Sequence, residues 1–160
     1  MAITGDIVES YRHPRAVLRR KLAMGAEEGR ALAVLMAACV LFFVAQWPGL
    51  ARAAAADPTI PLDARLGGAL MATLFLLPLI AYGIAALSHL VARALGGRGS
   101  NFGARLALFW ALLAVSPLML LNGLADGFLE PGLVRYALGI VVLAAFLLLW
   151  LNALIEAEKA

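Results

Sequence analysis

Four stretches without a charged residue divide this 160-residue chain and decide most of what it can fold into. They contain 21, 27, 20 and 20 residues and cover 31–51, 66–92, 106–125 and 136–155. A helix rises about 1.5 Å per residue, so roughly 20 apolar residues cross a hydrocarbon core about 30 Å thick. Each stretch meets that length. The stretches are rich in Ala and Leu and lack the alternation of a barrel strand, so helices are the expected spanning structure.

The composition agrees with lipid as the main solvent of this chain. Hydrophobic residues make up 64% and charged residues 14%, against roughly 45–50% and 25% in ordinary soluble domains. A soluble protein of this size cannot bury so much apolar surface in one core. A soluble enzyme and a disordered tail are therefore excluded. The net charge is only +3, and the basic residues are few and not gathered on one broad face, which argues against nucleic acid as a partner.

These observations predict an all-α fold: a polytopic membrane helix bundle with four transmembrane helices. The predicted helices cover about 31–48, 66–93, 105–124 and 134–154, within a transmembrane domain of residues 31–155. A cytoplasmic lead-in of residues 1–30 precedes this domain and a cytoplasmic tail of residues 156–160 follows it. A cleaved signal peptide over residues 31–47 is the alternative for the first span. It is disfavoured because 30 residues precede it and the run exceeds the usual 7–15.

The distribution of Lys and Arg predicts the orientation of the chain. Ten of the 13 lie in the lead-in, in the connector between the second and third spans, and in the tail. The other three are Arg52, Arg65 and Arg135. Cytoplasmic segments carry the excess of positive residues. We therefore expect both termini in the cytoplasm, and an even number of spans, which places both termini on one side, agrees with that.

The lead-in carries an apolar stripe bordered by cations. Pro14 is well placed to begin a helix, in which Val17, Leu18 and Leu22 share one face. The flanking cations are Arg15, Arg19, Arg20 and Lys21. This pattern is typical of an amphipathic helix lying in the headgroup layer, where it contacts anionic lipid headgroups or a partner. The alternative is that these cations only fix the topology and bind nothing specific.

The connector after the second span is rich in glycine. It reads Gly96-Gly97-Arg98-Gly99-Ser100, which superficially suggests a phosphate-binding loop. A preceding strand and a following Lys-Ser or Lys-Thr pair are missing. A helix that stops at Gly96 and continues into a flexible turn is the better interpretation.

The same region carries a resemblance to a known family. A membrane helix ends in the pattern His-x-x-Ala-Arg-x-Leu-Gly-Gly-x-Gly-Ser over residues 89–100, followed by Phe102 and a helix with Pro117. This arrangement, with the lead-in Pro-Arg-x-x-hydrophobic-Arg from Pro14, resembles bacterial members of the Yip (Ypt-interacting-protein) membrane-domain family over residues 10–121. The resemblance implies a membrane helix bundle in a bacterial inner (cytoplasmic) membrane, without an assigned activity.

Two departures limit what this resemblance carries over. Family members commonly have about five spans, whereas this chain has four predicted spans, as in a short variant. The Asp-Leu-Tyr-Gly-Pro motif of the eukaryotic branch is absent from the sequence. The role of eukaryotic relatives with Rab-type GTPases is therefore not expected here.

Polar residues inside the spans are few, and none of them pairs into a catalytic site. His89 lies near the cytoplasmic interface, one turn before Arg93. Together with Arg93 and Arg98 it is a candidate contact for a lipid phosphate. The alternative is that His89 only caps the end of its helix. Cys39 is the single cysteine and His89 one of only two histidines, so neither a metal nor a cofactor is expected. We predict no enzymatic activity.

Small residues and prolines in the spans suggest helix packing. Gly67, Gly68, Ala72 and Gly83 in the second span allow another backbone to approach closely. Pro78 in the same span predicts a kink. In the third span Pro117 follows Ser116, whose hydroxyl can satisfy the carbonyl that the proline leaves free.

These features together favour a non-enzymatic membrane scaffold or accessory subunit that docks on a larger membrane complex. Its expected partners are the lipid bilayer and either another membrane protein or a second copy of the chain. A small transporter or channel subunit is the alternative, and it depends on Thr73 and Ser116 as polar groups within the membrane.

Overall fold

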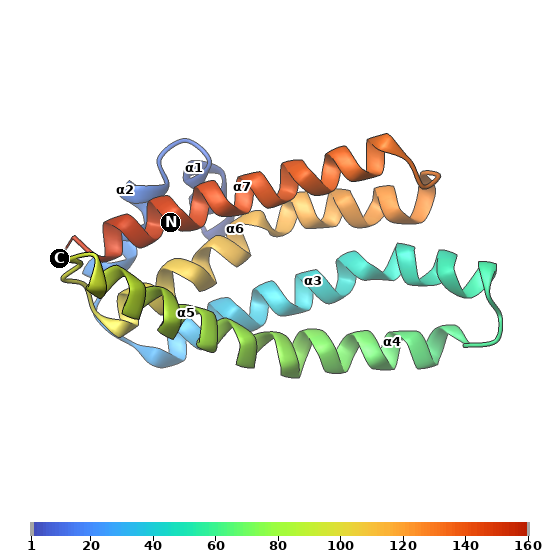
Figure 1. The fold of residues 1–160 in the computed structure, drawn as a ribbon, viewed down its shortest axis with the longest axis horizontal. Coiled ribbons are helices and arrows are strands. Elements are labelled where there is room, and N and C mark those ends of the chain that lie inside the picture. Colours follow the sequence, from blue (N-terminus) through green and yellow to red (C-terminus); the bar gives the residue numbers. More distant parts are fainter. Residues whose placement is uncertain (1, 160) are drawn as a thin grey trace.

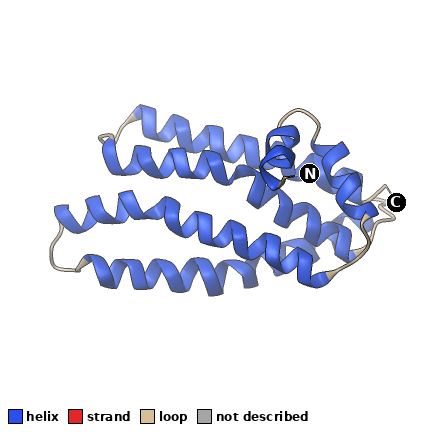
Figure 2. Ribbon diagram, turned by 180° about the vertical axis from the view of Figure 1, so that it is seen from behind, coloured by secondary structure: helices blue, strands red, loops and turns tan. Residues whose placement is uncertain are grey.

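The computed structural model describes residues 2–159 and is built of helices throughout that range (Figures 1 and 2). Met1 and Ala160, the outermost residues of the predicted lead-in and tail, lie outside it. The elements in chain order are α1 (Ile3–Ser10), α2 (Pro14–Ala23), α3 (Glu28–Ala56), α4 (Leu62–Met71), the π-helical turn η1 (Ala72–Leu76), α5 (Leu77–Ala94), α6 (Asn101–Phe128) and α7 (Leu133–Ala157).

The predicted all-helical class is confirmed, as are four helices that are long and apolar enough to cross a membrane. They are Glu28–Ala56, Leu62–Ala94, Asn101–Phe128 and Leu133–Ala157, and the second joins α4, η1 and α5 into one rod of 33 residues. Each helix extends beyond the predicted range at both ends. The extra turns carry charged residues such as Glu28 and Arg65, which a sequence criterion based on uncharged runs leaves out.

Helix α6 is the centre of the bundle. In its most apolar stretch 61% of residues are buried inside the protein, against 17–28% in the other three long helices. α3, α5 and α7 pack around it, and α1 and α2 cover part of it near the chain termini (Figure 1). Phe109, fully buried, meets Tyr82 of α5 edge-on with ring centroids 5.0 Å apart. Lipid therefore surrounds the outer helices, while α6 is solvated by protein.

Two glycines bring α6 and α3 into backbone contact. A Cβ at Gly123 would lie 1.8 Å from the carbonyl oxygen of Ala45, and a Cβ at Gly127 would lie 2.4 Å from Cβ of Pro48. The two glycines are four residues apart, so they share one helix face. This small-xxx-small spacing is a common device for close helix packing in membranes.

The small residues predicted to pack in the second span do not contact another helix of the chain. A Cβ at Gly67, Gly68 or Gly83 would meet no heavy atom of the described residues within 4 Å, and Ala72 is exposed. The predicted close approach at these positions is thus not made by another helix of the described chain and stays a prediction for a partner. The rod contacts α3 and α6 elsewhere and leaves these residues facing outward.

The two helices accommodate Pro78 and Pro117 in different ways. At Pro117 the hydroxyl of Ser116 donates to the carbonyl oxygen of Leu113 at 2.7 Å, which is the carbonyl that the proline leaves free. That prediction is confirmed. Before Pro78 the helix widens into η1, where the N–H of Leu77 donates to the carbonyl of Ala72, five residues back. A π-turn of this kind absorbs the missing hydrogen bond of a proline.

We expect Gly123→Ala to lower the free energy of unfolding by about 1–3 kcal/mol, because the added methyl group overpacks the contact with Ala45. Gly139→Ala is the matched control, since its added methyl meets nothing within 4 Å among the described residues. Thermal unfolding of the purified protein in detergent, followed by circular dichroism, measures both. Equal stability of the two variants would contradict the close contact.

Candidate functional site

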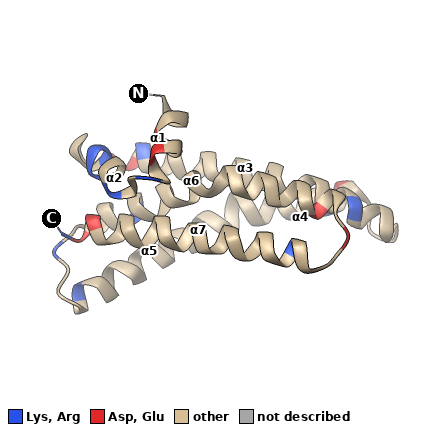
Figure 3. Cartoon of the chain, turned by 90° about the horizontal axis from the view of Figure 1, so that it is seen from above, with Lys and Arg blue, Asp and Glu red and all other residues tan. Residues whose placement is uncertain are grey.

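The most elaborate polar structure lies at the end of the bundle that carries both termini, called here the terminal end (Figure 3). Residues Ile3–Ala23, called here the N-terminal hairpin, fold as α1 and α2 and pack on α6 and α7. Val17 and Leu18 are fully buried. Val17 packs with Ala38, Trp110 and Leu113. The apolar stripe predicted to face lipid headgroups therefore packs on the bundle, and an interfacial position of this helix is not confirmed.

Ion pairs within the N-terminal hairpin hold α1 against α2. The carboxylate of Asp6 lies 2.7 Å from Arg20 and 2.8 Å from Lys21, and Glu9 lies 2.8 Å from Arg20. Burial alone would raise the pKa of Asp6, but hydrogen bonds from Lys21 and Arg20 outweigh it and lower the pKa. Lys21 also lies 3.8 Å above the ring of Trp110, a cation–π contact that ties α2 to α6.

Two hydrogen bonds anchor the N-terminal hairpin on α6, and a third, within α1, orients the Ser10 hydroxyl. The indole N–H of Trp110 donates to Oγ of Ser10 at 2.9 Å, and that hydroxyl donates to the carbonyl of Asp6 at 2.7 Å. The hydroxyl of Tyr11 donates to the carbonyl of Ala114 at 2.6 Å. Ala114 lies three residues before Pro117, where the proline disturbs the helical ladder. Burial raises the pKa of Tyr11, which keeps its hydroxyl a proton donor.

Acidic and polar residues of α7 bind the other side of the N-terminal hairpin. Glu156 lies 2.7 Å from Arg19 and 3.2 Å from Lys159. Nε of Arg15 donates to Oδ1 of Asn152 at 3.0 Å. Glu156 is 8% exposed, so most of its carboxylate is removed from solvent and its hydrogen bonds replace that solvation.

A second acid, Glu158 at the C-terminal cap of α7, joins three elements at the terminal end. Oε1 of Glu158 lies 2.7 Å from Nδ1 of His89 on α5, and its Oε2 accepts a hydrogen bond from the backbone N–H of Gly99 at 3.1 Å. Both His89 and Glu158 are buried. The backbone N–H of Arg98 donates to the carbonyl of Glu158 at 2.9 Å. α5, the connector and α7 are thus fastened at one point.

The glycines of the connector allow it to contact the end of α7 closely. The connector, predicted to be a flexible turn, is instead packed. Gly96, with φ 94°, ends α5, and the N–H groups of Gly96 and Gly97 return to the carbonyls of Arg93 and Ala92 at 3.0 and 2.8 Å. This is a Schellman motif. A Cβ at Gly99 would lie 2.2 Å from the carbonyl of Ala157. A side chain at this position would push α7 away from the connector.

The predicted contact residues fall into two groups. The side chains of Arg15, Arg19, Arg20, Lys21 and His89 are bound within the chain, whereas those of Arg93 and Arg98 are exposed. The prediction that His89 contacts a lipid phosphate is wrong in this structure, because its ring is 5% exposed and paired with an acid.

Sequence reasoning missed Asp6, Trp110, Glu156 and Glu158. A signal for two of them was present: Glu156 and Glu158 are acids directly after an apolar span, on the side of the predicted bundle that carries ten of the 13 Lys and Arg. A carboxylate in that position needs a cationic partner nearby.

The polar groups inside the membrane are used within their own helices. Thr73 Oγ1 donates to the carbonyl of Ala69, and Ser116 Oγ to that of Leu113, both at 2.7 Å. Each hydroxyl thus donates its one proton to a carbonyl of its own helix. Over residues 2–159 no group of three or more His, Cys, Asp or Glu side chains is placed to hold a metal ion.

No family model matches this chain, and neither does any curated protein or solved structure. The functional argument therefore depends on the geometry of the helices and of the terminal end.

We expect acid to release the N-terminal hairpin. A carboxyl with a lowered pKa in the folded state stabilises it above its ordinary pKa, and this contribution is lost as the pH falls through the lowered value. For Asp6 the loss begins below its ordinary value of 3.8. Asp6→Asn should weaken docking at pH 7 and flatten the acid transition, leaving the contributions of Glu9 and Glu156, whose pKa values the arginines of α2 also lower.

The fluorescence of Trp110, isolated by Trp47→Phe and Trp150→Phe, reports this release, because Trp110 is 3% exposed beneath Lys21. Glu130→Gln, in an exposed pair with Arg52 at the other end of the bundle, is the control and should leave the transition unchanged. A transition in the Asp6→Asn protein as steep as in the parent would refute the role of Asp6.

We expect the pair His89–Glu158 to show a coupling energy of about 0.5–3 kcal/mol in a double-mutant cycle with His89→Gln and Glu158→Gln. The buried pair joins two helices, so loss of one partner leaves the other group unsatisfied. The exposed pair Glu27–Arg30, within α3 and its cap, should give only about 0.2–0.5 kcal/mol. Unfolding in detergent measures both cycles, and similar coupling in the two would disprove the fastening.

Proposed function

We propose that this chain is a non-enzymatic integral membrane protein of the Yip-like type, acting as a scaffold or accessory subunit that docks on a larger membrane complex. The supporting observation is the outward position of Gly67, Gly68 and Gly83 on the rod formed by α4, η1 and α5. Over α4 no residue is buried within the protein. This part of the rod therefore presents its surface to something outside the described chain.

The use of glycine elsewhere in the chain gives this observation its weight. Gly99, Gly123 and Gly127 lie where backbones touch, and a Cβ at each would collide with another element. In a helix interior, glycine is about 0.8–1.0 kcal/mol less favourable than alanine. Three outward glycines on one rod are best explained by a helix of another molecule that approaches as closely as α3 approaches α6.

The proposed location is the bacterial inner membrane with both termini in the cytoplasm. Both ends of the described chain lie at the terminal end of the bundle, where most Lys and Arg gather (Figure 3). The cytoplasmic side of a membrane is the side with the excess of positive residues. Arg93 and Arg98 are exposed there and are the proposed contacts for anionic lipid headgroups. No nucleic acid is proposed as a partner.

The test is extraction of the protein from its native membrane into nanodiscs, with identification of what accompanies it by mass spectrometry. We expect a stoichiometric membrane partner, which the double variant Gly67→Leu/Gly68→Leu reduces about tenfold or more, the equivalent of about 1.4 kcal/mol. Gly139→Leu is the matched control on α7, since Gly139 is also exposed.

Two results would overturn the proposal in different ways. Recovery of the protein with lipid alone would remove the accessory role. A partner that the double variant retains as well as the control would remove the glycine face as its docking surface.

A further inference from the structure

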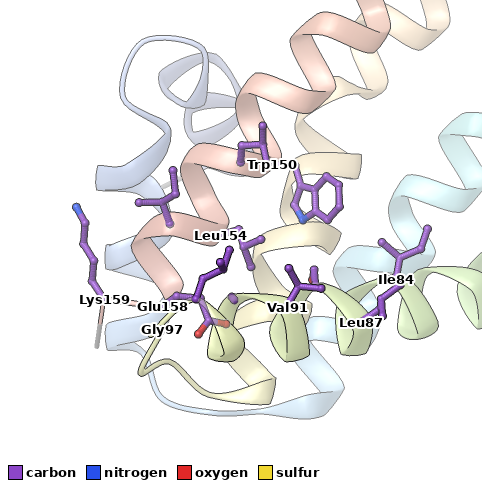
Figure 4. Close-up of a pocket in the computed structure, with 13 residues that line it drawn as sticks. Ile84, Leu87, Val91, Gly97, Trp150, Leu154, Glu158 and Lys159 are labelled. Atoms are coloured by element: carbon purple, nitrogen blue, oxygen red, sulfur yellow. The ribbon is translucent and has the colours of Figure 1, made fainter.

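An apolar groove runs between α5 and α7 at the terminal end (Figure 4). Its volume is about 570 Å³, within the range of about 300–1,000 Å³ for ligand sites. Ile84, Leu87 and Val91 form one wall, and Trp150, Leu154 and Ile155 the other. Hydrocarbon is the chemistry that such walls accept.

The groove exists because α5 and α7 are both held by α6 but lean on different neighbours. α5 packs on α6 and α3, whereas α7 packs on α6 and on α2 of the N-terminal hairpin. The pair His89–Glu158 draws α5 and α7 together at the terminal end. From this pair toward Ile84, the groove faces away from α6 and toward the surface that lipid covers.

The length of the groove distinguishes a lipid tail from a partner helix. It follows α5 from Ile84 to Leu95, twelve residues whose eleven rises of 1.5 Å extend about 16 Å. That is about half of a hydrocarbon core of roughly 30 Å. A transmembrane helix of a partner needs a surface along the whole core, whereas an acyl chain occupies a single leaflet.

The mouth of the groove suits a phosphate. Glu158 lines it, but this carboxylate is 8% exposed and engaged by His89 and Gly99. The cations nearest the mouth are Lys159, whose side chain is 54% exposed although its ammonium also pairs with Glu156 at 3.2 Å, and the exposed Arg98, which follows Gly97 on the connector. Gly97 also lines the mouth and adds no side chain that would close it.

We propose that this groove holds one acyl chain of a glycerophospholipid from the leaflet at the terminal end, with its headgroup phosphate beside Lys159 and Arg98. The site depends on the membrane-spanning fold and is independent of the partner proposed above. The bound lipid fills the gap between α5 and α7 as the N-terminal hairpin fills the gap between α3 and α7.

Photochemical labelling tests this site in the full-length protein. The protein is reconstituted in nanodiscs of phosphatidylethanolamine and phosphatidylglycerol, with a phosphatidylglycerol that carries a diazirine in its acyl chain. Mass spectrometry then maps the labelled residues. We expect labels concentrated on groove residues such as Leu87, Leu154 and Ile155. Labels spread evenly over the exposed faces of α4 and α7 would refute a defined site.

A filled groove provides the matched variant. Ala92 lines the groove, and Ala92→Phe should lower labelling of the groove about tenfold, since excluding about two methylene groups from an apolar site has that effect. Ala86→Phe is the control: Ala86 is exposed on the same helix, six residues away and so on another face. Equal loss in both variants, or no loss in either, would contradict the proposal.

A third measurement excludes another protein chain as the occupant. Leu87→Cys places a thiol in the groove, while the native Cys39 is buried. Under the proposal this variant stays monomeric under oxidising conditions. A disulfide-linked dimer of the chain would assign the groove to a second copy and overturn the lipid assignment.

Discussion

The ion pairs at the terminal end are the interaction on which the rest of this structure depends. Each long helix has an end there, and charged groups that lie near lipid are costly unless they are paired. Glu28 with Arg105 links α3 to α6, Glu156 with Arg19 links α7 to α2, and Glu158 with His89 links α7 to α5. Since lipid tails are as apolar as the helix faces, these polar contacts, together with close packing such as that of Gly123 on α3, distinguish one helix neighbour from another.

Glycine has two opposite roles in this chain. At Gly99 and Gly123 it lets backbones meet, whereas at Gly67 and Gly83 it faces outward. Only the first role follows from the chain's own packing. The second requires an explanation outside the chain, because an outward glycine in a helix gains nothing from the absence of its side chain. A surface of this kind points to a neighbour that the single chain does not contain.

The sequence predicted the helices well and their neighbours poorly. Span length follows from the uncharged runs, and the bond from Ser116 to Leu113 follows from local proline geometry. Periodicity also identified the apolar stripe of α2, but it could not distinguish protein from lipid as the cover for Val17, because both are apolar. The pairing of His89 with Glu158 spans 69 residues and depends on how α5 and α7 pack on α6. No local pattern carries that information.

The same physics separates the two outward surfaces. The glycine face of α4 and α5 extends from Gly67 to Gly83 on a 33-residue rod, about 24 Å at 1.5 Å per residue, which is most of a hydrocarbon core of roughly 30 Å. The groove between α5 and α7 ends at Ile84, about halfway across the membrane, and opens beside exposed cations. A partner helix would leave half of its length without a cover there, while an acyl chain would not. The two proposed surfaces adjoin on α5, where Gly83 and Leu87 lie four residues apart and share a face, so their length and the charge at their ends, rather than their separation, distinguish the occupant of each.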